Sequence, residues 1–84
     1  RPKAEKQDTG HAEHGTDDAL LLYNVGCFYS LAGKDDDAFD ALRRSFEDGL
    51  IDPEWMRHDS DLDPIRDDPR FGKLLAEMDA VLAG

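Results

Sequence analysis

Three aspartates in the second half of the chain have the spacing of the first ligands of a calcium-binding loop. Asp59, Asp61 and Asp63 stand at relative positions one, three and five. Such a loop also needs a glycine at position six for its sharp turn and a glutamate at position twelve as bidentate ligand. Those positions hold Pro64 and Arg70. We therefore expect no specific metal site in this segment.

The remaining reactive residues do not form a recognisable active site. Cys27 is the only cysteine, and it stands inside the apolar run 20–31 with no base near it in sequence, which predicts a small packed side chain. His11 and His14 form an H-x2-H pair without further ligands. Neither a glycine-rich phosphate loop nor a G-x-S-x-G nucleophile motif is present in the sequence. We expect a protein that is not an enzyme and has no cofactor.

Composition limits the class of partner. The 84 residues carry 20 acidic and 10 basic side chains, a net charge of −10, which disfavours nucleic acid and anionic membranes. Most of the acids are aspartate, and one hypothesis is adaptation to high salt, which screens their repulsion. A single cysteine cannot form an intramolecular disulfide, and this favours a cytoplasmic protein.

The chain divides into a tail and one domain. Residues 1–16 contain no large apolar side chain and are predicted to be a disordered linker. Residues 17–84 are predicted to be a single helical domain. Because the sequence lacks an initiator methionine and a targeting segment, we expect it to be a piece of a longer protein.

Two helices, at about 17–32 and 36–48, are predicted to form an antiparallel hairpin. Aspartates begin each helix, where the helix dipole favours negative charge, and Gly33 and Gly49 stand where helices end. The first helix is apolar nearly all round, so neighbouring helices should cover it on more than one side. It is too short, and too closely flanked by aspartates, for a membrane span. Gly26 inside it costs about 1 kcal/mol relative to alanine, which predicts close approach of the second helix.

Three Asp-Pro steps after the hairpin predict helix starts, because aspartate is a good N-cap and proline suits the first helical position. They predict a short helix at about 53–58, one turn at 64–67 and a final helix at 69–82. An apolar stripe of the final helix should cover the first two helices, with three other apolar residues in the same core. The stripe is Phe71, Leu74, Leu75, Met78 and Leu82, and the core residues are Trp55 (alternatively a binding hot spot), Leu62 and Ile65.

The hairpin resembles the tetratricopeptide repeat (TPR), a helix–turn–helix unit of 34 residues. The matching positions are Leu22, Val25, Gly26, Tyr29, Ala38, Leu42 and Ser45, with leucine in place of the usual tryptophan and second-helix aromatic, and serine in place of an alanine. Residues 55–75 resemble the segment W-x3-D-x-D-L-D-P-[IL]-R-x-D-P-R-F that often follows the last repeat in bacterial proteins. The resemblance implies an all-α fold that forms the C-terminal end of a TPR region, closed by a capping helix.

The resemblance also implies a function. The first helix of a TPR lines a concave face that binds a peptide or a partner protein, here through Leu20, Tyr23, Asn24, Cys27 and Leu31. The basic residues with which some TPR proteins bind a terminal carboxylate are missing. Two alternatives stay open: a purely structural cap packed on upstream repeats of a longer solenoid, and a module that self-associates into a homo-oligomer.

Overall fold

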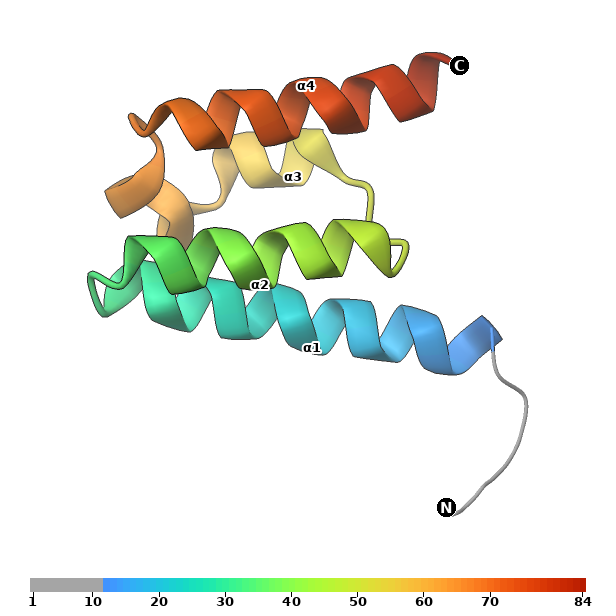
Figure 1. The fold of residues 1–84 in the computed structure, drawn as a ribbon, viewed down its shortest axis with the longest axis horizontal. Coiled ribbons are helices and arrows are strands. Elements are labelled where there is room, and N and C mark those ends of the chain that lie inside the picture. Colours follow the sequence, from blue (N-terminus) through green and yellow to red (C-terminus); the bar gives the residue numbers. More distant parts are fainter. Residues whose placement is uncertain (1–11) are drawn as a thin grey trace.

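The computed structural model describes the backbone of residues 12–84 and the side chains from Asp18 onward. The described residues contain helices and no strand: α1 (Ala12–Leu31), α2 (Asp35–Glu47), α3 (Pro53–His58), the 3-10 helix η1 (Ser60–Ile65) and α4 (Pro69–Ala83). This confirms the predicted all-α architecture of a hairpin, a short helix and a C-terminal helix (Figure 1).

The hairpin ends where glycine allows a left-handed backbone. Gly33 has a φ of 78° and Gly49 a φ of 114°. After each glycine the next backbone N–H donates back into the helix, from Lys34 to the Tyr29 carbonyl at 2.9 Å and from Leu50 to the Ser45 carbonyl at 3.0 Å. Both predicted helix ends are confirmed to within one residue.

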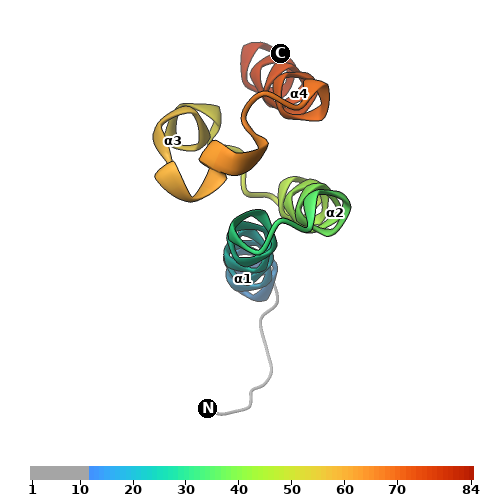
Figure 2. The same ribbon diagram turned by 90° about the vertical axis from the view of Figure 1, so that its left-hand side faces the viewer.

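The four described α-helices form a bundle around one core. Viewed end-on, α1, α2, α4 and α3 follow one another around the core, and η1 lies between α3 and α1 (Figure 2). α1 packs against α2 and η1, whereas α4 packs against α2 and α3. Besides α2, the element that covers α1 is therefore η1. The largest fully buried apolar side chains are Leu42, Met56, Leu62, Ile65, Leu74 and Met78. Leu62 and Ile65 of η1 are therefore in the core, as predicted.

The N-terminal boundary of the first helix was predicted too late. α1 begins at Ala12, before the expected start at Asp17. A helix that has formed its first turn extends at little further cost, even through residues that bury nothing. The predicted linker 1–16 thus overlaps α1 in residues 12–16, and residues 1–11 lie outside the described part of the chain. The side chains of His11 and His14 also lie outside it.

The middle Asp-Pro step does not begin a helix, contrary to prediction. The outer two steps do, with Asp52 and Asp68 as N-caps, but Pro64 lies inside η1, which Asp59 caps. A 3-10 helix would use the N–H of residue 64 to bond the Asp61 carbonyl, and proline has none. The hydroxyl of Ser30 in α1 donates to that carbonyl at 2.8 Å instead. This hydrogen bond fastens η1 to α1.

Two predicted core residues are exposed. Trp55 is 62% exposed because Pro53 and Met56 are the residues of short α3 that face inward. Leu82 is 60% exposed because the last turn of α4 extends past the end of α3 (Figure 1). The other four members of the α4 stripe are buried as predicted. Among the described residues, no helix combines the length and the hydropathy that crossing a bilayer requires.

Candidate functional site

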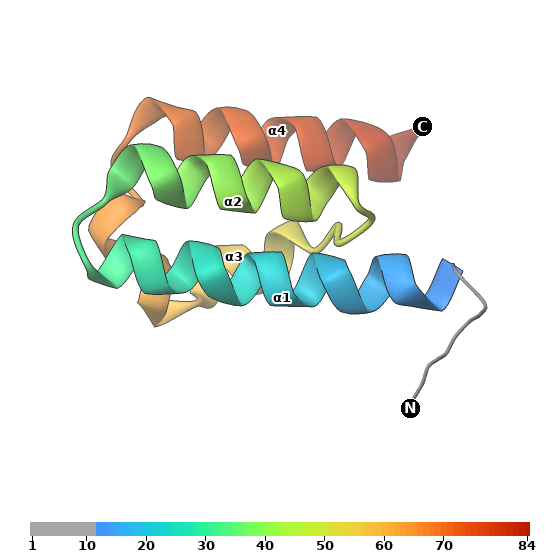
Figure 3. The same ribbon diagram turned by 60° about the horizontal axis from the view of Figure 1, so that its bottom comes forward.

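A cleft of about 390 Å³ lies between α1 and the segment that contains α3 and η1; we call it the α1–α3 cleft. In Figure 3, α3 lies behind α1. From α1 the cleft is lined by Leu20, Tyr23, Asn24 and Cys27. Across from them stand Leu50, Asp52, Trp55, Met56, Asp59 and Asp61.

The structure brings together four of the five site residues predicted from the sequence. Tyr23 and Cys27 are buried in the wall of the cleft, whereas Leu20 and Asn24 stand at its open edge. Leu31 does not line the cleft; it is 61% exposed near the C-terminal end of α1. The resemblance to the TPR singled out this side of α1, and helical spacing places positions 20, 23, 24 and 27 together on it.

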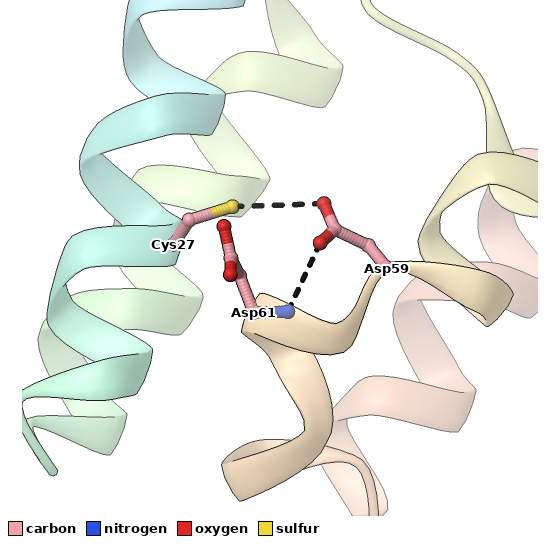
Figure 4. Close-up of side chains that lie close together, drawn as sticks. All are labelled: Cys27, Asp59 and Asp61. Atoms are coloured by element: carbon pink, nitrogen blue, oxygen red, sulfur yellow. Dashed lines mark hydrogen bonds between the residues drawn. The ribbon is translucent and has the colours of Figure 1, made fainter.

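Asp59 joins the two sides of the cleft. Its Oδ2 accepts a hydrogen bond from the Tyr23 hydroxyl at 2.5 Å, and the Cys27 Sγ lies 3.9 Å from the same oxygen. Its Oδ1 accepts the backbone N–H of Asp61 at 3.0 Å (Figure 4). The carboxylate therefore caps η1 and binds α1 at once, so the position of η1 against α1 depends on it.

The environment of the cleft keeps both α1 groups protonated. Burial, together with the hydrogen bond to Asp59, raises the pKa of Tyr23 well above its ordinary value. Burial and the charges of Asp59 and Asp61 raise the pKa of Cys27 from 9.0 to about 11. A thiol with this pKa is almost entirely protonated at neutral pH, which is the opposite of what an activated nucleophile needs.

The carboxylates of the cleft do not form the calcium loop that their spacing suggests. Ligand atoms of Cys27, Asp59 and Asp61 lie within 4.8 Å of one another (Figure 4). Asp63 turns away and pairs with Arg66 at 2.8 Å. A protonated thiol is a poor ligand, and Asp59 already accepts hydrogen bonds on both oxygens. The three residues are better described as the polar wall of the cleft.

Arg66 holds the segment that carries Asp59. Its guanidinium donates to the carbonyls of Met56 at 3.2 Å, Arg57 at 2.8 Å and Asp59 at 2.7 Å. It also bonds the Asp63 carboxylate at 2.8 Å. One planar side chain thus satisfies carbonyls at the end of α3 and in the link to η1. This fixes the bend that directs Asp59 toward α1.

An exposed apolar strip continues from the cleft along α1. It consists of Leu20, Leu21, Phe28 and Leu31, which are between 53% and 65% exposed, and we call it the outer face of α1. At 3.6 residues per turn these positions span about 100° of the helix. Asn24 lies within the same arc, so the cleft and the outer face are one continuous surface. The prediction that neighbouring helices cover α1 on more than one side is confirmed, because both α2 and η1 pack against it, and the outer face of α1 remains exposed.

Sequence reasoning assigned no binding role to most of the residues opposite α1. These residues come from different parts of the chain: Leu50 from a linker, Asp52 from the N-cap of α3 and Met56 from the core. No periodicity connects them with α1. Trp55 was considered as a binding hot spot, and its exposed position at the cleft suits that alternative. For Asp59 and Asp61 the sequence indicated only part of a calcium-loop spacing, from which no metal site was expected, and two positions of the segment that resembles the end of a TPR region.

Comparisons with protein-family models, with curated proteins and with solved structures found no match for this chain.

Proposed function

We propose that this protein is a non-catalytic, TPR-like protein-interaction module, which binds a peptide or a segment of a partner protein in the α1–α3 cleft and along the outer face of α1. The single observation that carries the proposal is the continuity of these two surfaces. A cleft lined by Tyr23, Cys27 and Met56 opens directly onto exposed leucines of the same helix. Apolar clefts with a few fixed polar groups are the usual form of ligand sites.

The chemistry of the cleft supports binding over catalysis. The Cys27 thiol has a raised pKa, and the Asp59 carboxylate is engaged by hydrogen bonds from both sides of the cleft. The Cys27 thiol lies 3.9 Å from the Asp59 carboxylate, but burial and this carboxylate raise its pKa, whereas an activated thiol nucleophile needs a lowered one. A single buried cysteine also supports the proposal that the protein works in the reducing cytoplasm.

Binding should be tested with a random peptide library displayed on phage. Selection on the immobilised protein should enrich peptides that bind the wild type and not the variant Leu20→Ser. Leu20 is 53% exposed, so its replacement removes a wall of the cleft without emptying the core. Leu82→Ser is the matched control, because Leu82 is similarly exposed on α4 and lies outside the cleft. Failure to enrich any peptide, or equal binding to Leu20→Ser, would contradict the proposal.

A second candidate function, a structural cap or self-association module, is favoured by Leu21 and Phe28. Both are more than 60% exposed on the outer face of α1, away from the cleft lining. Exposed apolar strips mark surfaces that another repeat or another copy covers. Sedimentation of the wild type and of Phe28→Ser distinguishes these functions. If the wild type is a dimer and Phe28→Ser dissociates it, the protein self-associates. If the wild type is a monomer, and hydrogen exchange of the α1 amides slows only when the domain is part of a longer parent protein, the domain is a cap.

A further inference from the structure

The α1–α3 cleft combines acidic and apolar lining residues. Asp52, Asp59 and Asp61 line it together with apolar and neutral side chains, and no basic side chain is among the lining residues. The chain as a whole has a net charge of −10. The field at the cleft is therefore negative both locally and over longer distance.

The three carboxylates are not equally available. Asp59 accepts hydrogen bonds on both oxygens, and Asp52 accepts the Trp55 backbone N–H at 3.0 Å as N-cap of α3. Asp61 contributes only its backbone atoms to the hydrogen bonds that fasten η1. Its exposed carboxylate projects beside Asp59 and Cys27 (Figure 4). Asp61 is thus the acidic group best placed to meet a ligand.

The apolar part of the cleft sets a second requirement for a ligand. Leu20 and Trp55, both more than half exposed, stand on opposite sides of the cleft above buried Met56. An apolar side chain placed between them would shield the indole and the leucine from water. The indole face also attracts a nearby cation.

We propose that the occupant of the cleft is a basic, apolar-anchored segment of a partner protein, in which a lysine or arginine lies within a few residues of a large apolar residue. The apolar side chain fills the space between Leu20 and Trp55, and the cation pairs with Asp61. This inference rests on the proposed function and specifies the chemistry of its partner. A second copy of the chain suits the acidic cleft less well than a basic segment does, because its own net charge is also −10.

The test uses the composition and the affinity of peptides from the display selection. Trp55 is the only tryptophan, so its fluorescence reports occupancy of the cleft directly. The leading peptide should be made in three forms: with its lysines and arginines, with glutamine in their place, and with glutamate in their place. Each form should be titrated against the wild type, Asp61→Asn and Asp67→Asn.

Asp67→Asn is the matched control, because it makes the same change in net charge at an exposed position outside the cleft. We expect Asp61→Asn to weaken the basic peptide about three- to fivefold and Asp67→Asn to leave it nearly unchanged. The glutamine form should bind more weakly, and the glutamate form weakest. The advantage of the basic form should shrink as salt rises to about 1 M.

The outcomes separate the inference from the proposed function. Two outcomes would contradict a basic partner and still support peptide binding. In the first, the enriched peptides bind the cleft equally well when glutamine or glutamate replaces their lysines and arginines. In the second, Asp61→Asn and Asp67→Asn have equal effects. A selection that enriches nothing overturns both.

Discussion

Gly26 of α1 lies directly against Leu42 of α2. A methyl group placed on Gly26 would stand 2.8 Å from both Cγ and Cδ2 of Leu42, and 3.4 Å from the Ala38 carbonyl oxygen. Leu42 is 1% exposed, so its side chain is held by the surrounding core. The close approach predicted from a glycine inside a helix is therefore confirmed, and it sets the distance between the two helices of the hairpin.

The first prediction is that Gly26→Ala destabilises the protein. Alanine gains about 1 kcal/mol of helix propensity over glycine, but overpacking a filled core costs about 1–3 kcal/mol, so a net loss of about 1 kcal/mol is expected. Gly72→Ala is the control, since nothing lies within 4 Å of its added methyl group and only the propensity gain of about 1 kcal/mol remains. Urea unfolding of both variants measures the difference. Equal stabilisation by the two substitutions would contradict the close packing.

The helices of this fold could be predicted from the sequence more completely than the cleft. Apolar periodicity, end glycines and Asp-Pro steps act locally, and they placed α2, α3 and α4 to within one residue at each end. The contact between Ser30 and the Asp61 carbonyl is different, because it compensates a missing N–H at Pro64 from a distant helix. No local pattern encodes such a hydrogen bond, so the position predicted for this short helix was wrong.

The same distinction applies to the candidate site. The α1 side of the cleft was expected from the resemblance to the TPR, and helical spacing explains why Leu20, Tyr23, Asn24 and Cys27 lie together. The opposite side depends on how a short linker folds back onto α1. That path is fixed by tertiary contacts of Asp59 and Arg66, which sequence spacing alone does not reveal.

The second prediction concerns the reactivity of Cys27. Its pKa of about 11, against 9.0 for a free thiol, lowers the thiolate fraction at a pH of about 8 by about two orders of magnitude. Iodoacetamide should therefore alkylate the folded protein about 100-fold more slowly than the protein in concentrated urea. Mass spectrometry of timed samples gives both rates. Alkylation of the folded protein at the denatured rate would show that the thiol is neither buried nor influenced by Asp59 and Asp61.

The third prediction is a loss of stability at alkaline pH. The pKa of Cys27 is higher in the folded protein than in the unfolded chain, so the folded state holds its proton more tightly. This contribution is fully present below pH 9 and is lost as pH rises toward about 11. Tyr23 acts in the same direction, because its pKa is raised as well. The urea midpoint should fall across this range, and less steeply in Cys27→Ala. Parallel curves for the variant and the wild type would refute the role of the thiol.

The fourth prediction is that Arg66→Lys loosens the acidic side of the cleft. A lysine keeps the charge but cannot reach the carbonyls of Met56, Arg57 and Asp59 together, so a loss of about 1–3 kcal/mol is expected. Because Asp59 then holds η1 less firmly, alkylation of Cys27 should become faster. Arg44→Lys is the control, since Arg44 makes only an exposed pair with Asp40 at 3.5 Å. A stability loss without faster alkylation would show that Arg66 does not position Asp59.

The fifth prediction follows from the net charge of −10. Repulsion among exposed carboxylates opposes folding, and about 1 M salt shortens the screening length to about 3 Å, from about 30 Å at about 0.01 M. If the acidity is an adaptation to high salt, the unfolding temperature should rise over this range of sodium chloride. Salt also screens the favourable ion pairs, such as Arg43 with Glu77 at 2.8 Å, so the sign of the change shows which effect is larger. The double variant Asp48→Asn, Asp67→Asn removes two exposed charges and should gain less from salt than the wild type. An unfolding temperature that stays constant or falls with salt would rule out the adaptation.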